Sequence, residues 1–490
     1  MHETLVILKK DVRRLWWQIG AALAMCAIIG RLDAGRAAAQ PGVVEGLLNI
    51  VLPLVWAFLI AQAIHHETLV GDREFWMTRP YRWGRLLAAK ALFAALAVHV
   101  PSFLTDAAIL AARGYDPLAS LPQLLVKQLL LAEGLTLPAM ALAAVVSNLT
   151  QFVIGIPILL VTLTASLGFS RDLPFGHLSY AVARLAVEFL AVAAISLALL
   201  QYRRRRTRLT RTLAVSALLA AGLLATLATG QQTFALNMAE SPAANIHATM
   251  TLAPPDPRAV HGTSGRRVFT TLPFSISGLP ESDWAWMASV SMDITGANGV
   301  RYHYDPLRMD FDMGLTGIVH DSTSLFLGLK HAAYDRIEDS KVTISGTVGF
   351  LVYERGQEVR LPVNATREVT QRMHCSSMYG EEPYDSAWLD VFCDSPDRDE
   401  VSADIWVPKP PAGWFRPDIG GFRSNRSPSP LIAWLSPLHR QQQSFRVGVP
   451  DRTMREAMAH TPIAIVPQRL AGYSTVSFKA SDIDLREYTR

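Results

Sequence analysis

The sequence has little charge, few cysteines and none of the short motifs that mark nucleotide or hydrolase sites. Of its 490 residues only 18% are charged, whereas soluble domains carry about 25%. A phosphate-binding G-x-x-x-x-G-K-[ST] loop is absent, and so are H-E-x-x-H and G-x-S-x-G. His374, Cys375, Glu381 and Glu382 lie close together, but their spacing fits no zinc pattern. We therefore expect no enzymatic activity, no cofactor and no metal.

Long hydrophobic runs fill the first half of the chain. The formal charge of +4 is too small to indicate a nucleic-acid partner. A membrane-spanning helix needs roughly 20 mostly apolar residues. Seven segments come close to this: Leu15–Gly30, Leu47–Ile64, Ala91–Ala112, Leu124–Val146, Phe152–Phe169, Ala181–Tyr202 and Leu213–Thr229. We expect an α-helical polytopic membrane bundle of about seven spans.

Lysine and arginine alternate between the loops of this predicted bundle. Basic clusters precede the first span, follow the second and follow the sixth, whereas the alternate loops carry at most two arginines each. The turn Ser147–Gln151 carries no charge and gives no indication. Because basic loops face the cytoplasm, the pattern places the N-terminus in the cytoplasm. An odd number of spans then puts the C-terminal part on the opposite side of the membrane.

The chain divides into three parts. Residues 1–14 have apolar and basic residues on opposite sides of a helix, which predicts an amphipathic helix on the membrane surface. Residues 15–230 are expected to form the transmembrane part, and residues 231–490 an extracytoplasmic β-rich domain. A cleaved signal peptide is disfavoured because Arg31, Asp33 and Arg36 follow the first apolar run.

The loop within His65–Lys90 is too polar to span a membrane. Asp72 is a suitable cap for a helix with Glu74 in its first turn, and Pro80 is a suitable stop. Between them Trp76 supplies an aromatic contact surface of the kind found at protein interfaces. From these residues alone, a docking helix and a simple interfacial anchor remain equally open.

The same loop carries a family resemblance. Its segment LVGDREFWMTRP at Leu69–Pro80, followed by a Leu-Leu-x-x-Lys run at Leu86–Lys90, resembles bacterial ABC transporter permeases of the type-2 exporter class. The resemblance covers roughly residues 1–205. It implies a six-span half-transporter in the bacterial inner membrane, working as a homodimer or with a second permease subunit. It also implies a separate ATPase subunit that docks on residues 65–90, with docking residues Asp72, Arg73, Glu74, Phe75, Trp76, Arg79 and Pro80.

Several ionisable residues interrupt the predicted spans. The candidates for intramembrane polar sites are His99, Asp106, Glu133 and Glu188. A charged group inside a membrane costs a few kcal/mol, so each needs an explanation. A substrate path or gate is one interpretation, and hydrogen bonding between helices is the other. Lys127 is expected to extend towards the membrane surface.

The C-terminal part changes to a two-residue period. Alternation over Trp286–Thr295, an Asn298-Gly299 turn and Val300–Tyr304 predict a hairpin. A second hairpin is expected from Val348–Val352 through a turn to Val359–Val363. These signals indicate an all-β sandwich, as one large unit or two small ones. Cys375 and Cys393 both fall in this part, where an oxidising compartment permits a disulfide between them.

Three functions compete at this point. The first is a permease subunit of an ABC-type exporter, driven by its partner ATPase. The second is a mechanotransmitter, in which ATP hydrolysis moves the exported domain and nothing crosses the membrane. The third is a membrane-anchored binding module, which is disfavoured because an anchor needs one span rather than seven. The added seventh span and the large C-terminal domain depart from the family pattern, so the first two functions both remain open.

Overall fold

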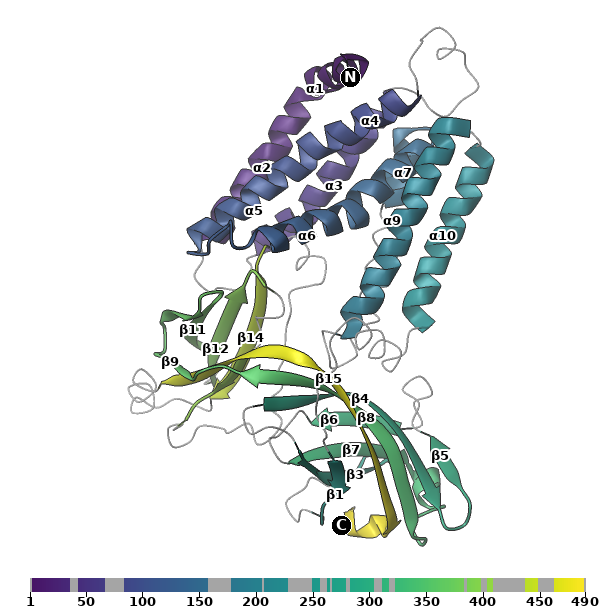
Figure 1. The fold of residues 1–490 in the computed structure, drawn as a ribbon, viewed down its shortest axis with the longest axis vertical. Coiled ribbons are helices and arrows are strands. Elements are labelled where there is room, and N and C mark those ends of the chain that lie inside the picture. The colour runs from purple at the N-terminus through teal and green to yellow at the C-terminus, as the bar shows by residue number, and fades with distance from the viewer. Residues whose placement is uncertain are drawn as a thin grey trace.

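The computed structural model divides the chain into an N-terminal helical region and a C-terminal β-rich region (Figure 1). It describes residues 2–35, 43–66, 83–156, 178–204, 207–227, 249–255, 262–264, 267–278, 283–303, 311–316, 322–382, 386–397, 403–408, 437–447 and 462–488. This division agrees with the change of period in the sequence near residue 230.

Three helical elements are long and apolar enough to cross a membrane: Leu47–His65, Trp83–Ala112 and Leu121–Val145. The first belongs to helix α3 (Val43–His65). A fourth candidate is the pair α1 (His2–Arg14) and α2 (Trp16–Gly35), if its two helices count as one span across their 73° bend. Among the described residues the structure thus supports three or four spans rather than seven.

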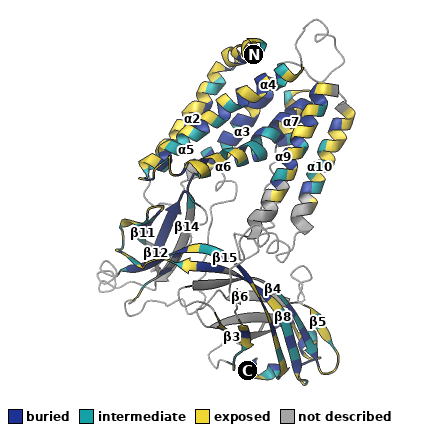
Figure 2. Cartoon of the chain, viewed as in Figure 1, coloured by how far each residue is buried: buried dark blue, intermediate teal, exposed yellow. Residues whose placement is uncertain are grey.

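Two further helices coincide with predicted spans without joining that count. Helix α9 (Leu178–Arg204) covers the sixth and α10 (Thr207–Leu227) the seventh. Most of the fifth, Phe152–Phe169, lies outside the described residues. Figure 2 shows exposed residues on the outward surfaces of these helices. They include large apolar side chains such as Val192, which is 65% exposed, and Leu219, which is 70% exposed. Surfaces of this kind fit contact with lipid.

Helix α1 forms over the residues for which the sequence predicts a helix, and it packs on the start of the candidate span Trp83–Ala112. Ile7 and Leu8 are buried, whereas Leu5 and Val12 are exposed. Asp11 forms an ion pair with Lys90 at 2.7 Å, with each side chain only 1% exposed. This pair joins α1 to helix α4 (Trp83–Ala94), which begins inside the segment 65–90 that the sequence predicts as a loop.

Two of the candidate spans contain a π-helical turn. In one span α4 continues through η1 (Ala95–His99) into α5 (Val100–Ala112). In the next, α6 (Leu121–Leu131) continues through η2 (Ala132–Thr136) into α7 (Leu137–Val145). Each π turn ends two residues before a proline, Pro101 or Pro138. Because proline lacks an N–H and its ring crowds the carbonyl four residues back, the helix wraps more widely there.

Within its described residues the β-rich region contains three antiparallel sheets. The first has the order β1-β3-β7-β6 with β2 beside β3, the second β10-β11-β12-β14, and the third β13-β15-β8-β4-β5 with β9 beside β15. The strands are β1 Thr249–Leu252, β2 Gly262–Ser264, β3 Arg267–Ser277, β4 Asp283–Gly296, β5 Arg301–His303, β6 Phe311–Thr316, β7 Ser322–Lys330, β8 Val342–Arg355, β9 Val359–Leu361, β10 Thr366–Thr370, β11 Met373–Glu382, β12 Ser386–Ser395, β13 Ala403–Trp406, β14 His439–Val447 and β15 Ile463–Ile483.

Two hydrophobic cores show that the region has two packed parts. One core joins the first sheet to the third and includes Phe274, Ile344 and Phe478. The other lies under the second sheet and includes Leu389 and Ile465. The 21-residue strand β15 contributes to both cores, since Phe478 and Ile465 are both on it. The two parts therefore share a strand. We call the part around Phe274, Ile344 and Phe478 the larger part, and the part around Leu389 and Ile465, which includes the second sheet, the smaller part.

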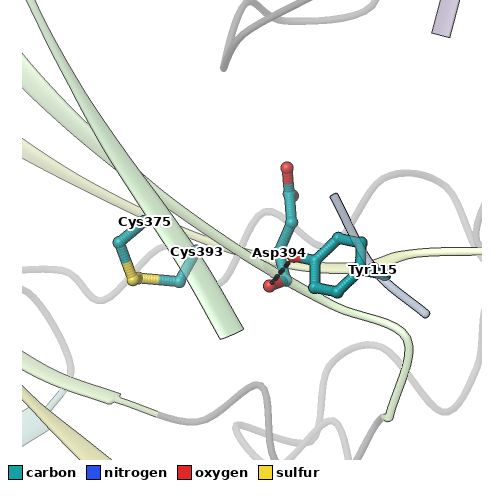
Figure 3. Close-up of a disulfide and its surroundings, with 4 residues drawn as sticks. All are labelled: Tyr115, Cys375, Cys393 and Asp394. Atoms are coloured by element: carbon teal, nitrogen blue, oxygen red, sulfur yellow. Dashed lines mark hydrogen bonds between the residues drawn. A yellow bond between two sulfur atoms is a disulfide. The ribbon is translucent and has the colours of Figure 1, made fainter. Parts of the chain in front are cut away.

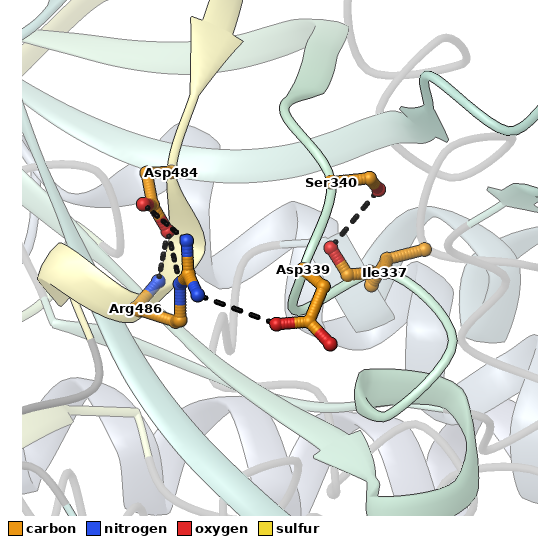
Figure 4. A network of polar contacts seen from close by, with 5 residues as sticks. All are labelled: Ile337, Asp339, Ser340, Asp484 and Arg486. Atoms are coloured by element: carbon orange, nitrogen blue, oxygen red, sulfur yellow. Dashed lines mark hydrogen bonds and ion pairs between the residues drawn. The ribbon is translucent and has the colours of Figure 1, made fainter.

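The C-terminal end of β15 is fixed to the larger part by an arginine. Arg486, in the short helix η3 (Leu485–Tyr488), binds Asp484 at 3.0 Å and Asp339 at 3.3 Å (Figure 4). Beside it Leu485 and Tyr488 are buried in the larger core. The chain end thus closes one side of that core.

One of the two predicted hairpins is confirmed and the other is wrong. Strands β4 and β5 pair across a turn in which Gly299 has a φ of +82°, and Val290, Met292 and Ile294 are buried as the alternation predicts. Strand β9, however, pairs with β15, and β8 pairs with β15 and β4. The sequence signal failed because β15, at about 3.3 Å per residue, is long enough to pair with both strands end to end.

A candidate functional site on the α5–α6 hairpin

Polar side chains connect the two π-containing spans to each other. His99, at the end of η1, contacts Gln128 Oε1 through Nδ1 at 3.0 Å and Thr136 Oγ1 through Nε2 at 3.1 Å. Thr136 is the last residue of η2. The two π turns therefore lie at the same level of the bundle, and one imidazole joins them.

Two more contacts follow along the same pair of helices. Gln128 Nε2 donates to Ser102 Oγ at 3.3 Å. One turn further on, Lys127 Nζ donates to Asp106 Oδ1 at 2.6 Å, with side-chain exposures of 11% and 5%. Lys127 therefore does not extend to a membrane surface as predicted: its ammonium pairs with the buried carboxylate of Asp106, which would otherwise be a buried charge without compensation.

We use the name α5–α6 hairpin for residues 100–131, which comprise α5, a turn and α6. The contacts of Gln128 with His99 and Ser102, and of Lys127 with Asp106, run from one helix to the other. Because buried polar groups in an apolar bundle gain most from pairing with each other, these contacts hold α5 and α6 together. They favour the helix-bonding interpretation of His99 and Asp106 over an open polar path.

The turn of the hairpin is attached to the smaller part of the β-rich region. The buried Tyr115 donates its hydroxyl to the backbone oxygen of Asp394 at 2.7 Å (Figure 3). Its ring stacks on His374, with 4.4 Å between ring centres and 19° between the planes. His374 and Asp394 are partners across strands β11 and β12. A single tyrosine thus contacts both central strands of that sheet.

Charged and apolar contacts surround the tyrosine. Arg113 donates to the backbone oxygen of Asp33 at 2.9 and 2.6 Å and lies 3.8 Å from the Asp394 carboxylate. It therefore joins the end of α2, the hairpin and the β sheet. Gln123 donates to Asp397 at 3.3 Å. Leu438 packs in one buried cluster with apolar residues of the hairpin, namely Ile109, Leu110, Tyr115 and Leu124. We call these contacts the junction.

A disulfide lies directly beside the junction. Cys375 and Cys393 face each other on β11 and β12 and are bonded, with 4.1 Å between their Cα atoms. Each is adjacent in sequence to a junction residue, His374 or Asp394. The predicted pair is thus bonded in the structure, and it connects the two strands that the hairpin contacts. No group of histidine, cysteine and carboxylate side chains suited to a metal occurs among the residues described.

The other predicted site residues lie outside the α5–α6 hairpin and the junction. Glu133 lies in η2 and Glu188 on α9, and these two elements pack on each other. Both carboxylates are half-buried. The predicted docking residues Asp72, Arg73, Glu74, Phe75, Trp76, Arg79 and Pro80 lie outside the described residues. The structure describes the helix that follows them in the sequence, α4, where Lys90 pairs with Asp11 of α1.

The sequence analysis did not identify three of the residues that make these contacts. Gln128, Thr136 and Tyr115 are uncharged residues in apolar surroundings, and they attract no attention individually. For the contact between Asp106 and Lys127, however, the spacing in the sequence gives a signal. Asp106 lies seven residues before Arg113, and Lys127 lies seven residues after Ser120, so the two are symmetric about the turn. In a helical hairpin, residues at equal distances from the turn lie at the same level.

Comparisons with known proteins give no further guidance: no protein-family model matches the chain, and no curated protein matches it.

Proposed function

We propose that the chain is the membrane subunit of an ABC-type exporter, driven by a separate ATPase that docks on the loop of residues 65–90. In this proposal the chain crosses the bacterial inner membrane seven times: the four candidate elements, with α1 and α2 counted as one, are joined by the predicted span Phe152–Phe169 and by α9 and α10. The N-terminus is cytoplasmic and the β-rich region extracytoplasmic. The subunit works as a homodimer or with a second permease subunit.

One observation carries the proposal. The helical element Trp83–Ala112 begins three residues after Pro80, the last of the predicted docking residues, and ends at the junction with the β-rich region. At 1.5 Å per residue its 30 residues cover about 45 Å, the thickness of a bilayer with its headgroups. A force applied to the loop has a direct path along this helix to the opposite side.

The start of that path is held by the amphipathic helix. The buried ion pair Asp11–Lys90 and the exposed pair Glu3–Arg85 both join α1 to α4. A displacement of the loop would therefore move α1 and α4 together. This arrangement supports a mechanical role for residues 65–90, beyond anchoring in the headgroups.

The junction favours a second candidate, mechanotransmission without transport. The hairpin ends on the β-rich region through a buried tyrosine, a stacked histidine and an arginine. The polar side chains inside the hairpin bind one another and support a closed interior between α5 and α6. Both features fit a subunit whose task is to move its β-rich region.

The docking step is tested by co-purification from the native membrane. A tagged full chain should retain an ATPase, and the variant Glu74→Ala/Trp76→Ala should lose it, since interface hot spots contribute about 2 kcal/mol or more each. The matched control is Trp16→Ala, which removes an aromatic side chain that is 70% exposed but lies outside the loop. Retention of the ATPase and of stimulated hydrolysis by the double variant would leave the loop as an interfacial anchor and refute the docking proposal.

A further inference from the structure

The two π-helical turns have the same cause and the same level in the bundle. In η1 the N–H of Val100 bonds to the oxygen of Ala95, and in η2 the N–H of Leu137 bonds to the oxygen of Ala132. Both bonds reach five residues back rather than four. Each donor immediately precedes a proline, Pro101 or Pro138, which supplies no donor of its own. Helices bend at such positions, and π turns often mark functional ones.

Beyond the π turns the hairpin is one body. The Asp106–Lys127 pair and the Ser102–Gln128 hydrogen bond fix α5 to α6 between the π turns and the turn of the hairpin. At that turn Tyr115 fixes the hairpin to strands β11 and β12. Arg113 lies 3.8 Å from Asp394 of β12 and also donates to Asp33 at the end of α2, on which α5 packs, so the end of α2 belongs to the same body. On the other side of the π turns, α7 packs on α9, and α9 packs on α10.

We propose that the α5–α6 hairpin is a lever that carries the smaller part of the β-rich region and turns at η1 and η2. The source of the motion rests on the proposed function, namely an ATPase acting at the loop before α4. The geometry of the lever rests on the prolines, the π turns and the junction alone. Tyr115 and Arg113 are positioning residues in this device, since they couple the lever to the sheet.

The expected displacement follows from the length of the lever. From His99 to Ala112 the helix rises by about 20 Å at 1.5 Å per residue. A rotation of about 15°, the size of known rigid-body transitions, would move the end of the lever by about 5 Å. That displacement is within the range of paired spin-label distance measurements.

The test uses the full chain in lipid nanodiscs with Cys26→Ala to remove the free thiol. One label pair, Ala119→Cys/Glu368→Cys, lies within the proposed lever and sheet. The other, Leu219→Cys/Glu368→Cys, extends from α10 across the π turns. All three positions are exposed. We expect a narrow distance distribution for the 119/368 pair and a broader one for the 219/368 pair, with or without an ATPase present.

The hinges are tested by restoring ordinary helical bonding. Pro101→Ala/Pro138→Ala returns both N–H donors and should narrow the 219/368 distribution to the width of the 119/368 pair. The matched control is Pro53→Ala, since Pro53 lies inside helix α3 and outside both π turns. It should leave the width unchanged. Equal widths for the two pairs before any proline is replaced would overturn the lever.

Coupling to the sheet is tested at Tyr115. Tyr115→Ala should broaden the 119/368 distribution, whereas Tyr115→Phe keeps the ring on His374 and should broaden it less. Labelling of the Cys375–Cys393 pair only after reduction checks that each variant is folded. No broadening with Tyr115→Ala would show that the tyrosine does not position the sheet.

Nucleotide separates this inference from the proposed function. With the co-purified ATPase, Mg-ATP should shift the 219/368 distance by about 5 Å and leave the 119/368 distance unchanged. A shift in the 119/368 distance would overturn the lever. Absence of any bound ATPase, with the unequal widths and the proline effect intact, would refute the proposed function and leave the lever standing.

Discussion

Replacement of Lys90 by methionine tests how the amphipathic helix is held on the bundle. The ammonium of Lys90 lies 2.7 Å from Asp11, and both side chains are 1% exposed. Methionine keeps most of the volume of lysine and removes its charge. The Asp11 carboxylate then stays buried without its ionic partner, and the desolvation that the pair had offset is no longer compensated.

The expected loss of stability is large and depends on which partner remains. Breaking a buried pair by removing one charge costs about 3–5 kcal/mol, whereas replacing both charges with apolar side chains is often near neutral. Asp11→Leu/Lys90→Met should therefore be more stable than Lys90→Met alone. For domains of 150–250 residues, 1 kcal/mol shifts the melting temperature by about 2–4 °C. The single variant should thus melt about 6–20 °C below the unmodified chain.

A matched control is present on the same two helices. Arg85 pairs with Glu3 at 2.5 Å, but these side chains are 40% and 39% exposed. Exposed pairs contribute about 0–1 kcal/mol, so Arg85→Met should change the melting temperature little. Thermal unfolding of the purified full chain in detergent measures all variants, and the two single and one double replacement at Asp11 and Lys90 form a double-mutant cycle.

The cycle has a result that would refute the reasoning. If Lys90→Met is no more destabilising than Arg85→Met, burial of the Asp11–Lys90 pair has no energetic consequence. A double variant that is less stable than both single variants would contradict the argument in another way. It would mean that each side chain stabilises the fold even without its partner, so that loss of the pairing does not explain the effect of the single replacements.

Three further predictions concern the β-rich region. Replacing Cys375 and Cys393 with serine should lower the free energy of unfolding of this region by about 3 kcal/mol, because the disulfide closes a loop with a sequence separation of 18. An unchanged urea midpoint, measured by limited proteolysis at each urea concentration, would contradict this. The hydrogen bond from Arg301 lowers the pKa of Asp293. The stabilisation that this bond gives to the fold is therefore complete above the unfolded pKa of about 3.9 and is lost as pH falls through the lower folded pKa. Asp293→Asn should therefore cost less than about 1 kcal/mol at neutral pH and nothing in strong acid, as measured by unfolding across pH. Asn298→Cys, in an exposed turn, should react with an impermeant maleimide only from outside the cell, and labelling from the cytoplasmic side would refute the proposed orientation.

Sequence patterns predicted the helices better than their number of crossings. Apolar runs fix where a helix forms, and six of the seven predicted spans coincide with helices. Helix α9 ends in Arg203 and Arg204, and α10 begins with Arg208 and Arg211 among its first five residues. These arginines lie together where the two helices adjoin in sequence, and in the proposal they set the orientation of the chain.

Strand pairing was predictable only where it is local. The β4–β5 hairpin follows from the Asn298-Gly299 turn because turn residues set the register of adjacent strands. Strand β9 pairs with a strand that begins about a hundred residues later, as Leu361 faces Ile463. No turn residue encodes that contact. It depends on the buried face of β15, which is decided only when the whole core assembles.

The candidate site shows the same limit from the functional side. Asp106 and His99 were identifiable because a polar side chain in an apolar run needs a partner. The partners could be found only by placing α5 and α6 antiparallel, at which point Asp106 meets Lys127 and His99 meets Thr136. Once paired, these groups are no longer an argument for a substrate path, because each one that the argument uses already has its partner across the hairpin. The function is therefore better sought at the two ends of the helical element Trp83–Ala112. At one end lie the predicted docking loop and the buried Asp11–Lys90 pair, and at the other Tyr115 lies against the β sheet. A helix held by a buried contact at each end, with a π turn before a proline between them, is suited to transmit movement.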